Sequence, residues 1–496
     1  MTMRTAVSRC LPAVLAIAVF LTACGGGSTT GGTGGGGGTN PPPSTANEWA
    51  WMSGSNTVGS AGAYGTLGTG SSGSEPGARD SAVSWTDSSG NLWLFGGEGF
   101  DSTGTDGDLN DLWEFNSTAK TWAWQSGGST VPKQYEGQPG VYGTQGVAAS
   151  NNVPGGRYSG VSWIDSSGDL WMFGGLGFYS STSQSAFLND LWEFNPSTRE
   201  WTWMSGSNTP GTVVYGVYGT QGVPSASNVP GARGYAVSWI DSSGNLWLFG
   251  GEGAGVNPMV SAVGWFNDLW EFNPSTKQWT WVSGSSSQNA TSVYGTQGVA
   301  APGNVPGARE NAASWIDKSG NLWLFGGQSF NATGGNTQRL NDLWEFSPTT
   351  KQWTWVSGSD TQLTCADGVY GSQGTAAATN VPGGRYSAVS WVDSSGELWL
   401  FGGQGCGSSS YGYLDDLWDF NPSTKQWTWM AGSGTPNAAG VYGTQGTAVA
   451  SNAPGARGAA VSWIDTGGNL WLFGGEGYAS STSASGDLND LWRYQP

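Results

Sequence analysis

The chain has 496 residues, among them 85 Gly, 31 Trp and no His, and its formal net charge is −18. Without histidine there is no Ser-His-Asp triad, no imidazole general base and no histidine metal ligand. The acidic balance argues against a nucleic-acid-binding protein, which needs a basic surface. A largely disordered chain is excluded, because 13% of the residues are aromatic and disordered chains contain few aromatic residues. Abundant Gly, Ser, Thr and Trp instead predict an all-β chain.

The N-terminus has the features of a signal peptide. Two arginines precede an apolar run from Leu11 to Phe20, which is too short to span a bilayer. The run ends in Leu-Thr-Ala-Cys, which resembles the lipobox of bacterial lipoproteins. The resemblance implies that residues 1–23 are removed and that Cys24 is lipidated; the alternative is an ordinary secretory signal peptide. Because Gly25 stands where an Asp would retain such lipoproteins in an inner membrane, the resemblance favours the outer membrane of the cell envelope.

Three parts follow from composition. Residues 1–23 are the predicted signal peptide. Residues 24–46 contain the lipidated Cys and a tether rich in Gly, Ser, Thr and Pro, with a reach on the order of 25 Å. Residues 47–496 are the predicted folded domain, attached to the membrane only through the lipid.

Four motifs recur six times in the folded domain: Tyr-Gly-(Thr/Ser)-(Gln/Leu)-Gly, Pro-Gly-(Ala/Gly)-Arg, Phe-Gly-Gly and Asp-Leu-Trp. Successive Phe-Gly-Gly motifs lie 72 to 78 residues apart, and such periods indicate repeat architectures. Each unit contains four short predicted strands, a to d, separated by Gly- or Pro-containing turns. In the third unit they span 235–240, 246–249, 268–272 and 278–282. This pattern is typical of a blade of four antiparallel strands.

The order of the strands predicts a closed ring. The domain begins with a strand of type d at 48–52, and it ends after a strand of type c at 490–494. The N-terminal strand would therefore complete the last blade. Closure removes the exposed edge strands of an open array. We predict a single six-bladed β-propeller.

The motifs also resemble a known family. The third unit reads Pro-Gly-Ala-Arg at 230–233, Gly-Asn-Leu-Trp-Leu-Phe-Gly-Gly at 244–251, Asn-Asp-Leu-Trp-Glu-Phe-Asn-Pro at 267–274 and Lys-Gln-Trp-Thr-Trp at 277–281. This order resembles the kelch repeat in all six units. The resemblance implies a kelch-type propeller like the central domain of galactose-oxidase-like copper enzymes, but without their copper site, which uses histidine. The units exceed the roughly 50 residues of a usual kelch repeat, and the excess lies between strand d and the next strand a.

Tryptophan marks the predicted core. Thirty of the 31 Trp occupy repeat positions, which favours packing between blades over a sugar-stacking surface. Trp265 is the exception and a candidate ligand contact. It lies at the end of a b–c loop, where the other units have Asp108, Phe187, Arg339, Tyr413 or Asp487.

The b–c loops and the d–a segments are expected on one face, because the strands alternate in direction. Variable loops on a rigid scaffold commonly carry binding residues. Their aromatic side chains are candidate ligand contacts, with local packing as the alternative. These residues are Phe100, Phe178, Tyr179, Trp265, Phe330, Tyr411, Tyr413 and Tyr478.

The repeat arginines lie at the entry of strand a on the same face. In the kelch family this position can line the central pocket, where guanidinium groups would bind carboxylates or anionic sugars. The alternative is that each Arg pairs with a repeat Asp such as Asp268. The six candidates are Arg79, Arg157, Arg233, Arg309, Arg385 and Arg457. The acids that follow two of them, Asp80 and Glu310, are expected to be surface charges.

Two cysteines remain after Cys10 leaves with the signal peptide and Cys24 takes the lipid. Cys365 lies in the segment before the fifth unit and Cys406 in its b–c loop. In an oxidising envelope we predict a disulfide between them; two free thiols are the alternative.

The sequence contains no metal-ligand spacing and no phosphate-binding loop, so we expect no metal and no cofactor. We predict a monomeric, non-catalytic scaffold on the cell envelope that binds a glycan or a protein, with no nucleic-acid partner. One alternative is a sugar-modifying enzyme, epimerase-like or mutarotase-like, that works with Glu310 and Arg309. Another is a structural surface component.

Overall fold

The chain divides into two units, Met1–Ser44 and Thr45–Pro496. The predicted signal peptide, Cys24 and the tether up to residue 45 lie outside the part that the computed structural model describes. In the part described, no helix is long and apolar enough to cross a membrane. The described residues are 46–180, 185–209, 214–254, 263–330, 337–361, 364–480 and 484–496.

The third blade shows how the sequence forms the sheet. Its strands are β13 (Val237–Ile240), β14 (Leu246–Phe249), β17 (Leu269–Asn273) and β18 (Gln278–Ser283), paired antiparallel in this order. The four predicted strands are confirmed, with ends that differ by two residues or fewer. The turn between β13 and β14 is held by Asp241, which accepts hydrogen bonds from the backbone N–H of Ser243 and from Trp247 Nε1, both at 2.9 Å.

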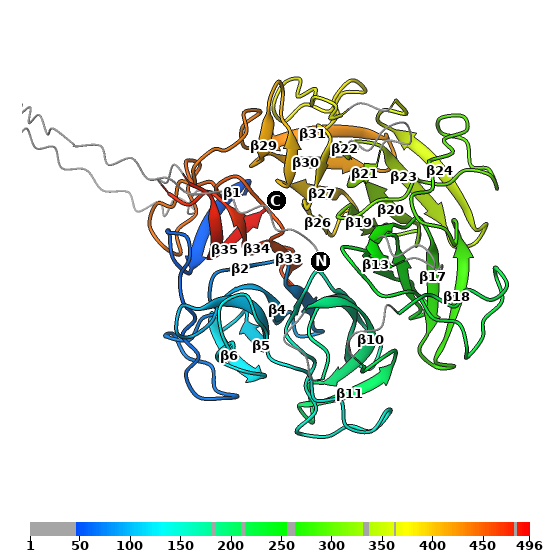
Figure 1. Cartoon of the computed structure of the whole chain (residues 1–496). Coiled ribbons are helices and arrows are strands. Elements are labelled where there is room, and N and C mark those ends of the chain that lie inside the picture. Colours follow the sequence, from blue (N-terminus) through cyan, green and yellow to red (C-terminus); the bar gives the residue numbers. More distant parts are fainter. Residues whose placement is uncertain are drawn as a thin grey trace, which may run out of the picture. The chain divides into compact units, whose positions relative to one another are not determined.

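The other strands repeat this plan around the ring (Figure 1). Blade 1 contains β2 (Arg79–Asp80), β3 (Val83–Thr86), β4 (Leu92–Phe100), β5 (Asp106–Asn116) and β6 (Thr121–Ser126). Blade 2 contains β7 (Arg157–Tyr158), β8 (Val161–Ile164), β9 (Leu170–Gly177), β10 (Ala186–Asn195) and β11 (Glu200–Ser205). Blade 3 adds β12 (Arg233–Gly234), β15 (Glu252–Ala254) and β16 (Val263–Trp265).

Blade 4 contains β19 (Ala313–Ile316), β20 (Leu322–Phe325), β21 (Gln328–Phe330), β22 (Thr337–Arg339), β23 (Leu343–Ser347) and β24 (Gln352–Ser357). Blade 5 contains β25 (Arg385–Tyr386), β26 (Val389–Val392), β27 (Leu398–Phe401), β28 (Gln404–Cys406), β29 (Tyr411–Tyr413), β30 (Leu417–Asn421) and β31 (Gln426–Ala431). Blade 6 contains β32 (Arg457–Gly458), β33 (Val461–Ile464), β34 (Leu470–Gly477) and β35 (Gly486–Gln495).

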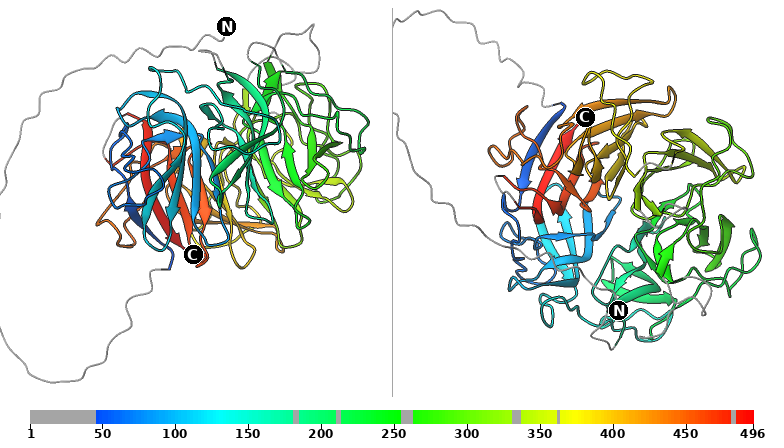
Figure 2. Two further views of the ribbon diagram at one scale, coloured as in Figure 1. Left: turned by 90° about the horizontal axis from the view of Figure 1, so that it is seen from below. Right: turned by 45° about the horizontal axis from the view of Figure 1, so that its top comes forward.

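The ring closes through the N-terminal strand β1 (Glu48–Ser53). β1 pairs antiparallel with β35, and Trp51 lies opposite Trp492. Figure 1 shows the two ends of the sequence colours, blue β1 and red β35, side by side. The predicted six-bladed propeller and its closing strand are therefore confirmed. Figure 2 shows the strands running through the thickness of the ring.

Six apolar cores hold the blades together, one at each interface between neighbours. At every interface a Trp of strand d packs on the Phe of the Phe-Gly-Gly motif in the preceding blade, with ring centroids 5.3 to 5.5 Å apart. Contacts of this kind add to the large apolar area that each ring buries. The interpretation of the repeated Trp as core residues is thus confirmed. The pairs are Phe95–Trp201, Phe173–Trp279, Phe249–Trp353, Phe325–Trp427, Phe401–Trp49 and Phe473–Trp122.

Each blade also contains a buried Arg–Asp cluster. In blade 3, Arg233 donates two hydrogen bonds to Asp268, at 2.7 and 2.8 Å. The same carboxylate accepts from Tyr218 Oη at 2.6 Å and from Trp270 Nε1 at 2.7 Å. Burial works against the charged Arg233, but the adjacent carboxylate outweighs it and raises its pKa above the ordinary value. The cluster thus joins the Tyr-Gly, Pro-Gly-Arg and Asp-Leu-Trp motifs into one network.

The residues in excess of a usual kelch repeat cover the outer edge of each blade. In the third unit, the N–H of Gly222 donates to Trp281 O at 2.8 Å, and Asn228 Nδ2 donates to Trp279 O at 3.0 Å. In the last blade, Asn452 makes the corresponding bond, at 3.1 Å, to Trp49 on the closing strand. Because unpaired edge strands promote aggregation, this cover protects the rim of the ring.

The b–c connections are more ordered than the sequence predicted. They were expected to be loops after the Phe-Gly-Gly motif. Instead Gly250 and Gly251 turn the chain with φ of 69° and 91°, and a second hairpin follows, in which β15 pairs with β12 and β16. A Cβ at Gly250 would lie 2.8 Å from Arg309 O of the next blade. The glycine pair therefore allows both the turn and the close approach of neighbouring blades.

Candidate functional site

A closed ring of backbone hydrogen bonds surrounds the centre of the propeller. It is formed by the second residue after each repeat Arg, whose N–H donates to the carbonyl of the equivalent residue in the preceding blade at 2.8 to 2.9 Å. All six adopt a left-handed φ between 52° and 59°, which costs about 1 kcal/mol or more for a residue other than Gly. The ring residues are Ser81, Ser159, Tyr235, Asn311, Ser387 and Ala459.

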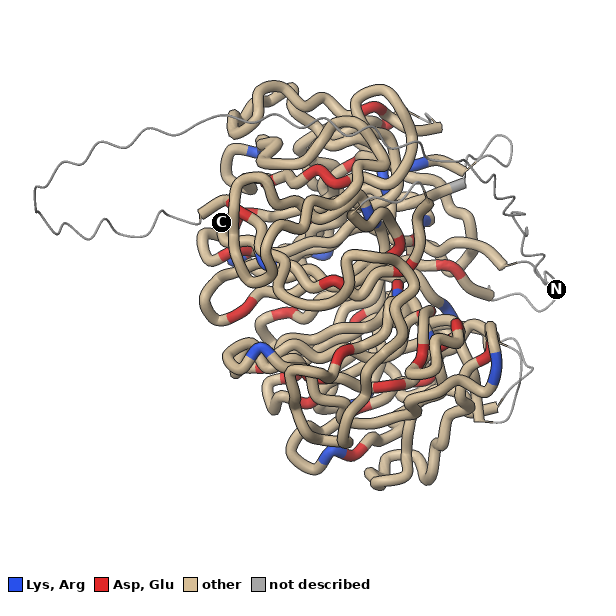
Figure 3. The backbone as a smooth tube through the Cα atoms, turned by 90° about the vertical axis from the view of Figure 1, so that its left-hand side faces the viewer, with Lys and Arg blue, Asp and Glu red and all other residues tan. Residues whose placement is uncertain are grey.

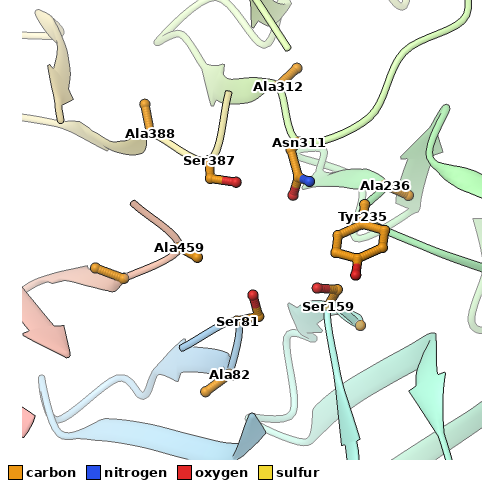
Figure 4. A pocket seen from close by; sticks show the side chains of 12 residues that line it. Ser81, Ala82, Ser159, Tyr235, Ala236, Asn311, Ala312, Ser387, Ala388 and Ala459 are labelled. Atoms are coloured by element: carbon orange, nitrogen blue, oxygen red, sulfur yellow. The ribbon is translucent and has the colours of Figure 1, made fainter. Parts of the chain in front are cut away.

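Two connected cavities lie on this ring. The inner one has a volume of about 150 Å³ and is lined by the ring residues and by the Ala or Gly that follows each of them. Figure 4 shows these side chains around an open space, with the Tyr235 ring at one side. The outer cavity is wider, about 340 Å³, and shares five lining residues with the inner one. It opens among the first residues of the b–c hairpins.

Three residues from each blade lie side by side at this level, and we call them the cavity row. They are the residue after the repeat Arg, the residue after Phe-Gly-Gly and the residue opposite it on the returning strand. No two blades have the same row, although identical motifs flank it. In blade order the rows are Asp80–Glu98–Asp108, Tyr158–Leu176–Phe187, Gly234–Glu252–Trp265, Glu310–Gln328–Arg339, Tyr386–Gln404–Tyr413 and Gly458–Glu476–Asp487.

The outer cavity is acidic and polar. Four carboxylates line it, together with three tyrosines, three side-chain amides and two serines; Lys and Arg are absent from its described lining. In Figure 3, the red Asp and Glu positions along the backbone outnumber the blue Lys and Arg positions. The carboxylates are Asp80, Glu252, Glu310 and Glu476, and the tyrosines are Tyr235, Tyr386 and Tyr413.

Glu310 is the most enclosed of these acids. Its side chain is 9% exposed, and Oε2 has no hydrogen-bond partner among the described residues. Burial, and then the nearby Glu252 carboxylate, raise the pKa of Glu310 to about 8. A buried carboxyl group with one unsatisfied oxygen thus belongs to the wall of the cavity.

A second acidic group lies where blades 6 and 1 meet. Burial, with further contributions from Glu98 and Glu476, raises the pKa of Asp80 to about 7. Burial and the charge of Asp80 raise the pKa of Asp487 to about 9. Because like charges at close range disfavour ionisation, these carboxyls hold protons near neutral pH.

The repeat arginines do not line this cavity, which corrects the ligand-contact prediction. Their side chains are 0 to 1% exposed, and each pairs with the Asp of the Asp-Leu-Trp motif at 2.5 to 2.7 Å. The structure shows the alternative that the sequence analysis also considered, in which each Arg pairs with a repeat Asp. The pairs are Arg79–Asp111, Arg157–Asp190, Arg233–Asp268, Arg309–Asp342, Arg385–Asp416 and Arg457–Asp490.

Two aromatic candidates are also corrected. Trp265 is 3% exposed and lies beside Glu252 across the hairpin. Tyr179 is 1% exposed, and its hydroxyl donates to Phe187 O at 3.1 Å. Both side chains stabilise their own blade and offer no surface to a ligand.

The other two tyrosine candidates lie at the site. Tyr413 lines the outer cavity and forms a hydrogen bond with Glu476. Tyr411 is 43% exposed at the rim, where the Arg339 guanidinium lies 4.9 Å from its ring centroid. Of the remaining loop aromatics, Phe178 is buried, and the side chain of Phe330 lies outside the described part.

Asp80 and Glu310 were expected to be surface charges, and this expectation is wrong, because both line the central cavity. A signal for them exists in the sequence. The residue after the repeat Arg differs between units whose neighbouring residues are nearly the same. The same comparison would have identified Glu252 and Glu476 after Phe-Gly-Gly.

A disulfide joins Cys365 and Cys406, whose Cα atoms are 6.1 Å apart. Cys406 ends β28, the strand that begins with the cavity residue Gln404. The crosslink therefore ties the segment that precedes blade 5 to one wall of the site, and it occurs in this blade only among the described residues.

One group of carboxylates in the described part has the spacing of metal ligands. Asp165, Asp169 and Glu193 can each offer an oxygen within 4.8 Å of the others. Asp165 and Asp169 lie in the a–b turn of blade 2 and Glu193 on β10, and none of the three lines the central cavities. Asp165 already accepts hydrogen bonds from Ser167 N at 2.8 Å and from Trp171 Nε1 at 2.9 Å, which are the bonds of the repeated turn.

The chain is similar to known proteins. Residues 144–361 match a family model described as the KLHDC2/KLHL20/DRC7 Kelch-repeats domain. A solved structure entitled "Structure of YjhT" is similar, with a TM-score of 0.47 and 17% sequence identity, over 84% of this chain and 95% of that chain. The closed ring, the repeated four-stranded blades and the Arg–Asp clusters define the fold as a six-bladed kelch-type β-propeller.

Proposed function

We propose that this protein is a non-catalytic binding propeller that takes a polar ligand, from a glycan or a protein, into its central cavity. One observation carries the proposal: the cavity rows differ from blade to blade, although the motifs that flank them are the same in all six units. Identical positions are sufficient to build six equal blades. Unequal residues at one level of the ring create the asymmetry that recognition of a ligand requires.

The cavity has the properties of a preformed binding site. Its outer part, at about 340 Å³, lies within the range of small-molecule pockets. The ring of backbone hydrogen bonds fixes the lining residues on strand ends, so little conformational entropy is lost when a ligand binds. Tyr, Asn, Gln and Ser side chains supply both donors and acceptors.

We further propose that the propeller is displayed as a monomer on the bacterial cell envelope, anchored through lipidated Cys24 and held off the membrane by the tether. The support is the sequence alone: the charged start, the short apolar run, the Leu-Thr-Ala-Cys tetrapeptide and the Gly-rich segment that follows.

A glycan array probed with residues 45–496, disulfide intact, tests the binding function. This unit contains every described strand, including both strands that close the ring. We expect binding to a subset of polar glycans and at least tenfold weaker binding for Tyr413→Ala. Tyr135→Ala, an exposed tyrosine outside the cavity lining, is the matched control and should bind normally. Binding that survives Tyr413→Ala would place recognition elsewhere and contradict the proposal.

A sugar-modifying enzyme is the second candidate function. The observation that favours it is the raised pKa of Glu310. A carboxyl with a pKa of about 8 can act as a general acid or base near neutral pH. Arg309, the other expected participant, is held by Asp342 and cannot assist. NMR can follow the interconversion of sugar anomers and the exchange of a C–H proton with solvent deuterium at an epimerised carbon, for the wild type and for Glu310→Gln. Turnover that is lost in the variant supports the enzyme.

A further inference from the structure

The ligand class follows from the charge and the polar groups of the outer cavity. We infer that the cavity binds an amino sugar with a free, protonated amine, held by carboxylates while Tyr, Asn and Gln side chains bind its hydroxyl groups. This inference rests on the proposed binding function and names its ligand.

Glu310 is the first argument for an amine. A buried carboxyl oxygen without a hydrogen-bond partner costs free energy, and Glu310 Oε2 is in that state in the wall of the cavity. An ammonium group supplies up to three donors and a compensating charge in one small centre. Glu252 lies close enough to raise the pKa of Glu310, so the cation would meet two carboxylates.

The opposite wall has the same character. Asp80 and Glu476 line it, and Glu98 and Asp487 lie beside them across the hairpins. Burial, and then the mutual repulsion of these groups, raises the pKa values of Asp80 and Asp487. A bound cation would relieve that repulsion, because an opposite charge favours the ionised carboxylates.

An anionic ligand is disfavoured. Each of the six repeat arginines forms an ion pair with a repeat Asp. No Lys or Arg belongs to the described lining of the outer cavity. Arg339 lies outside it, over the Tyr411 ring. A sulfated or carboxylated sugar would therefore enter a negative cavity without a partner.

The polar lining favours a sugar over a lysine side chain. Besides the acids, the outer cavity presents Tyr235, Tyr386 and Tyr413 together with side-chain amides and serines; only Gly458 and Ala459 are apolar. A lysine would place its four-carbon stem against these polar groups and leave them unsatisfied. A hydroxylated ring can satisfy them around its whole edge, and its C–H faces can stack on tyrosine.

Three disaccharides test the inference, because they share ring number and linkage and differ only at carbon 2. They are the β-1,4-linked dimers of glucosamine, of N-acetylglucosamine and of glucose. Their binding to residues 45–496 is measured by isothermal titration calorimetry at about pH 6. We expect the glucosamine dimer to bind at least tenfold more tightly than the other two, with an affinity that falls as salt is added.

The matched variants are Glu310→Gln and Glu271→Gln, which make the same replacement of a carboxyl group by an amide. Glu310→Gln should weaken binding of the glucosamine dimer at least tenfold and abolish its advantage over the glucose dimer. Glu271 lies on β17 outside the cavity lining, and its variant should bind as the wild type does. Circular dichroism confirms that both variants are folded.

Two outcomes would overturn the inference: similar affinities for all three dimers, or an unchanged amine preference in Glu310→Gln. A third, no binding of the glucosamine dimer together with Tyr413-dependent binding of another glycan on the array, would also exclude an amino sugar while leaving the proposed binding function intact. Failure of every glycan would instead count against the proposed function itself.

Discussion

The buried Arg–Asp clusters and the cavity rows lie next to each other in every blade, yet they differ in kind. Each cluster has the same four residue types in all six blades, with closely similar distances. One residue further along the chain, the row begins, and no two blades agree. The cluster is therefore the part that every blade needs in order to fold, and the row is the part that is free to differ.

The two regions also treat their charges differently. Each repeat Asp is satisfied by Arg, Tyr and Trp donors, so its burial is compensated. Among the acids of the rows, Glu310 Oε2 has no hydrogen-bond partner in the described part, and burial raises the pKa of Glu310 to about 8. Burial and neighbouring acids raise the pKa of Asp487 to about 9. Satisfied charges stabilise the fold, and the unsatisfied oxygen of Glu310 is the group that the proposed ligand would bind.

Breaking a cluster should have the largest effect. Asp268→Ala leaves Arg233 buried without its partner, and we expect the free energy of unfolding to fall by about 3–5 kcal/mol. Urea denaturation followed by tryptophan fluorescence measures this change. Glu271→Gln, on β17, which begins directly after Asp268, removes only a partly exposed ion pair with Lys351 and should change stability by less than about 1 kcal/mol. Equal effects of the two variants would contradict the comparison.

Removing the disulfide should have a somewhat smaller effect, because it acts mainly through the unfolded chain and its loss leaves no buried charge without a partner. In the chain-entropy model, a loop of 41 residues contributes up to about 4 kcal/mol. The double variant Cys365→Ser/Cys406→Ser should therefore unfold at lower urea concentration but still form the ring, and the Cys365→Ser single variant should lose the same amount. Retention of wild-type stability under reducing conditions would show that the crosslink does not constrain the unfolded chain.

The smallest and most specific effect is on the pH dependence of stability. The pKa of Glu310 is higher in the folded state than in the unfolded state. The free energy of unfolding therefore decreases as the pH rises from about 5 to 8, because Glu310 must then ionise while it is buried. Glu310 alone should lower stability by about 1 kcal/mol per pH unit in this window. Glu310→Gln should flatten the curve and be more stable than the wild type at about pH 8. An unchanged slope would mean that Glu310 ionises normally.

Much of this fold could be predicted from the sequence. The spacing of Phe-Gly-Gly, the turn at Asp241 and the displaced strand at 48–52 are local or periodic signals, and they gave the blades, their number and the closing pair of β1 and β35. The rows could be predicted only in part. Trp265 was recognised as different from its counterparts in other units, but a difference in sequence does not say which way a side chain points.

The sequence by itself determined what each unit must form, because strand period, turn residues and Trp positions act over a few residues. The tertiary structure decided which groups meet. Arg233 is buried because its blade brings Asp268 against it, and Trp265 packs inward because β16 pairs with β15. Glu310 lies at the centre because the backbone ring fixes the end of each inner strand. Whether a charge is satisfied depends on partners 30 or more residues away, and only the packed ring places them.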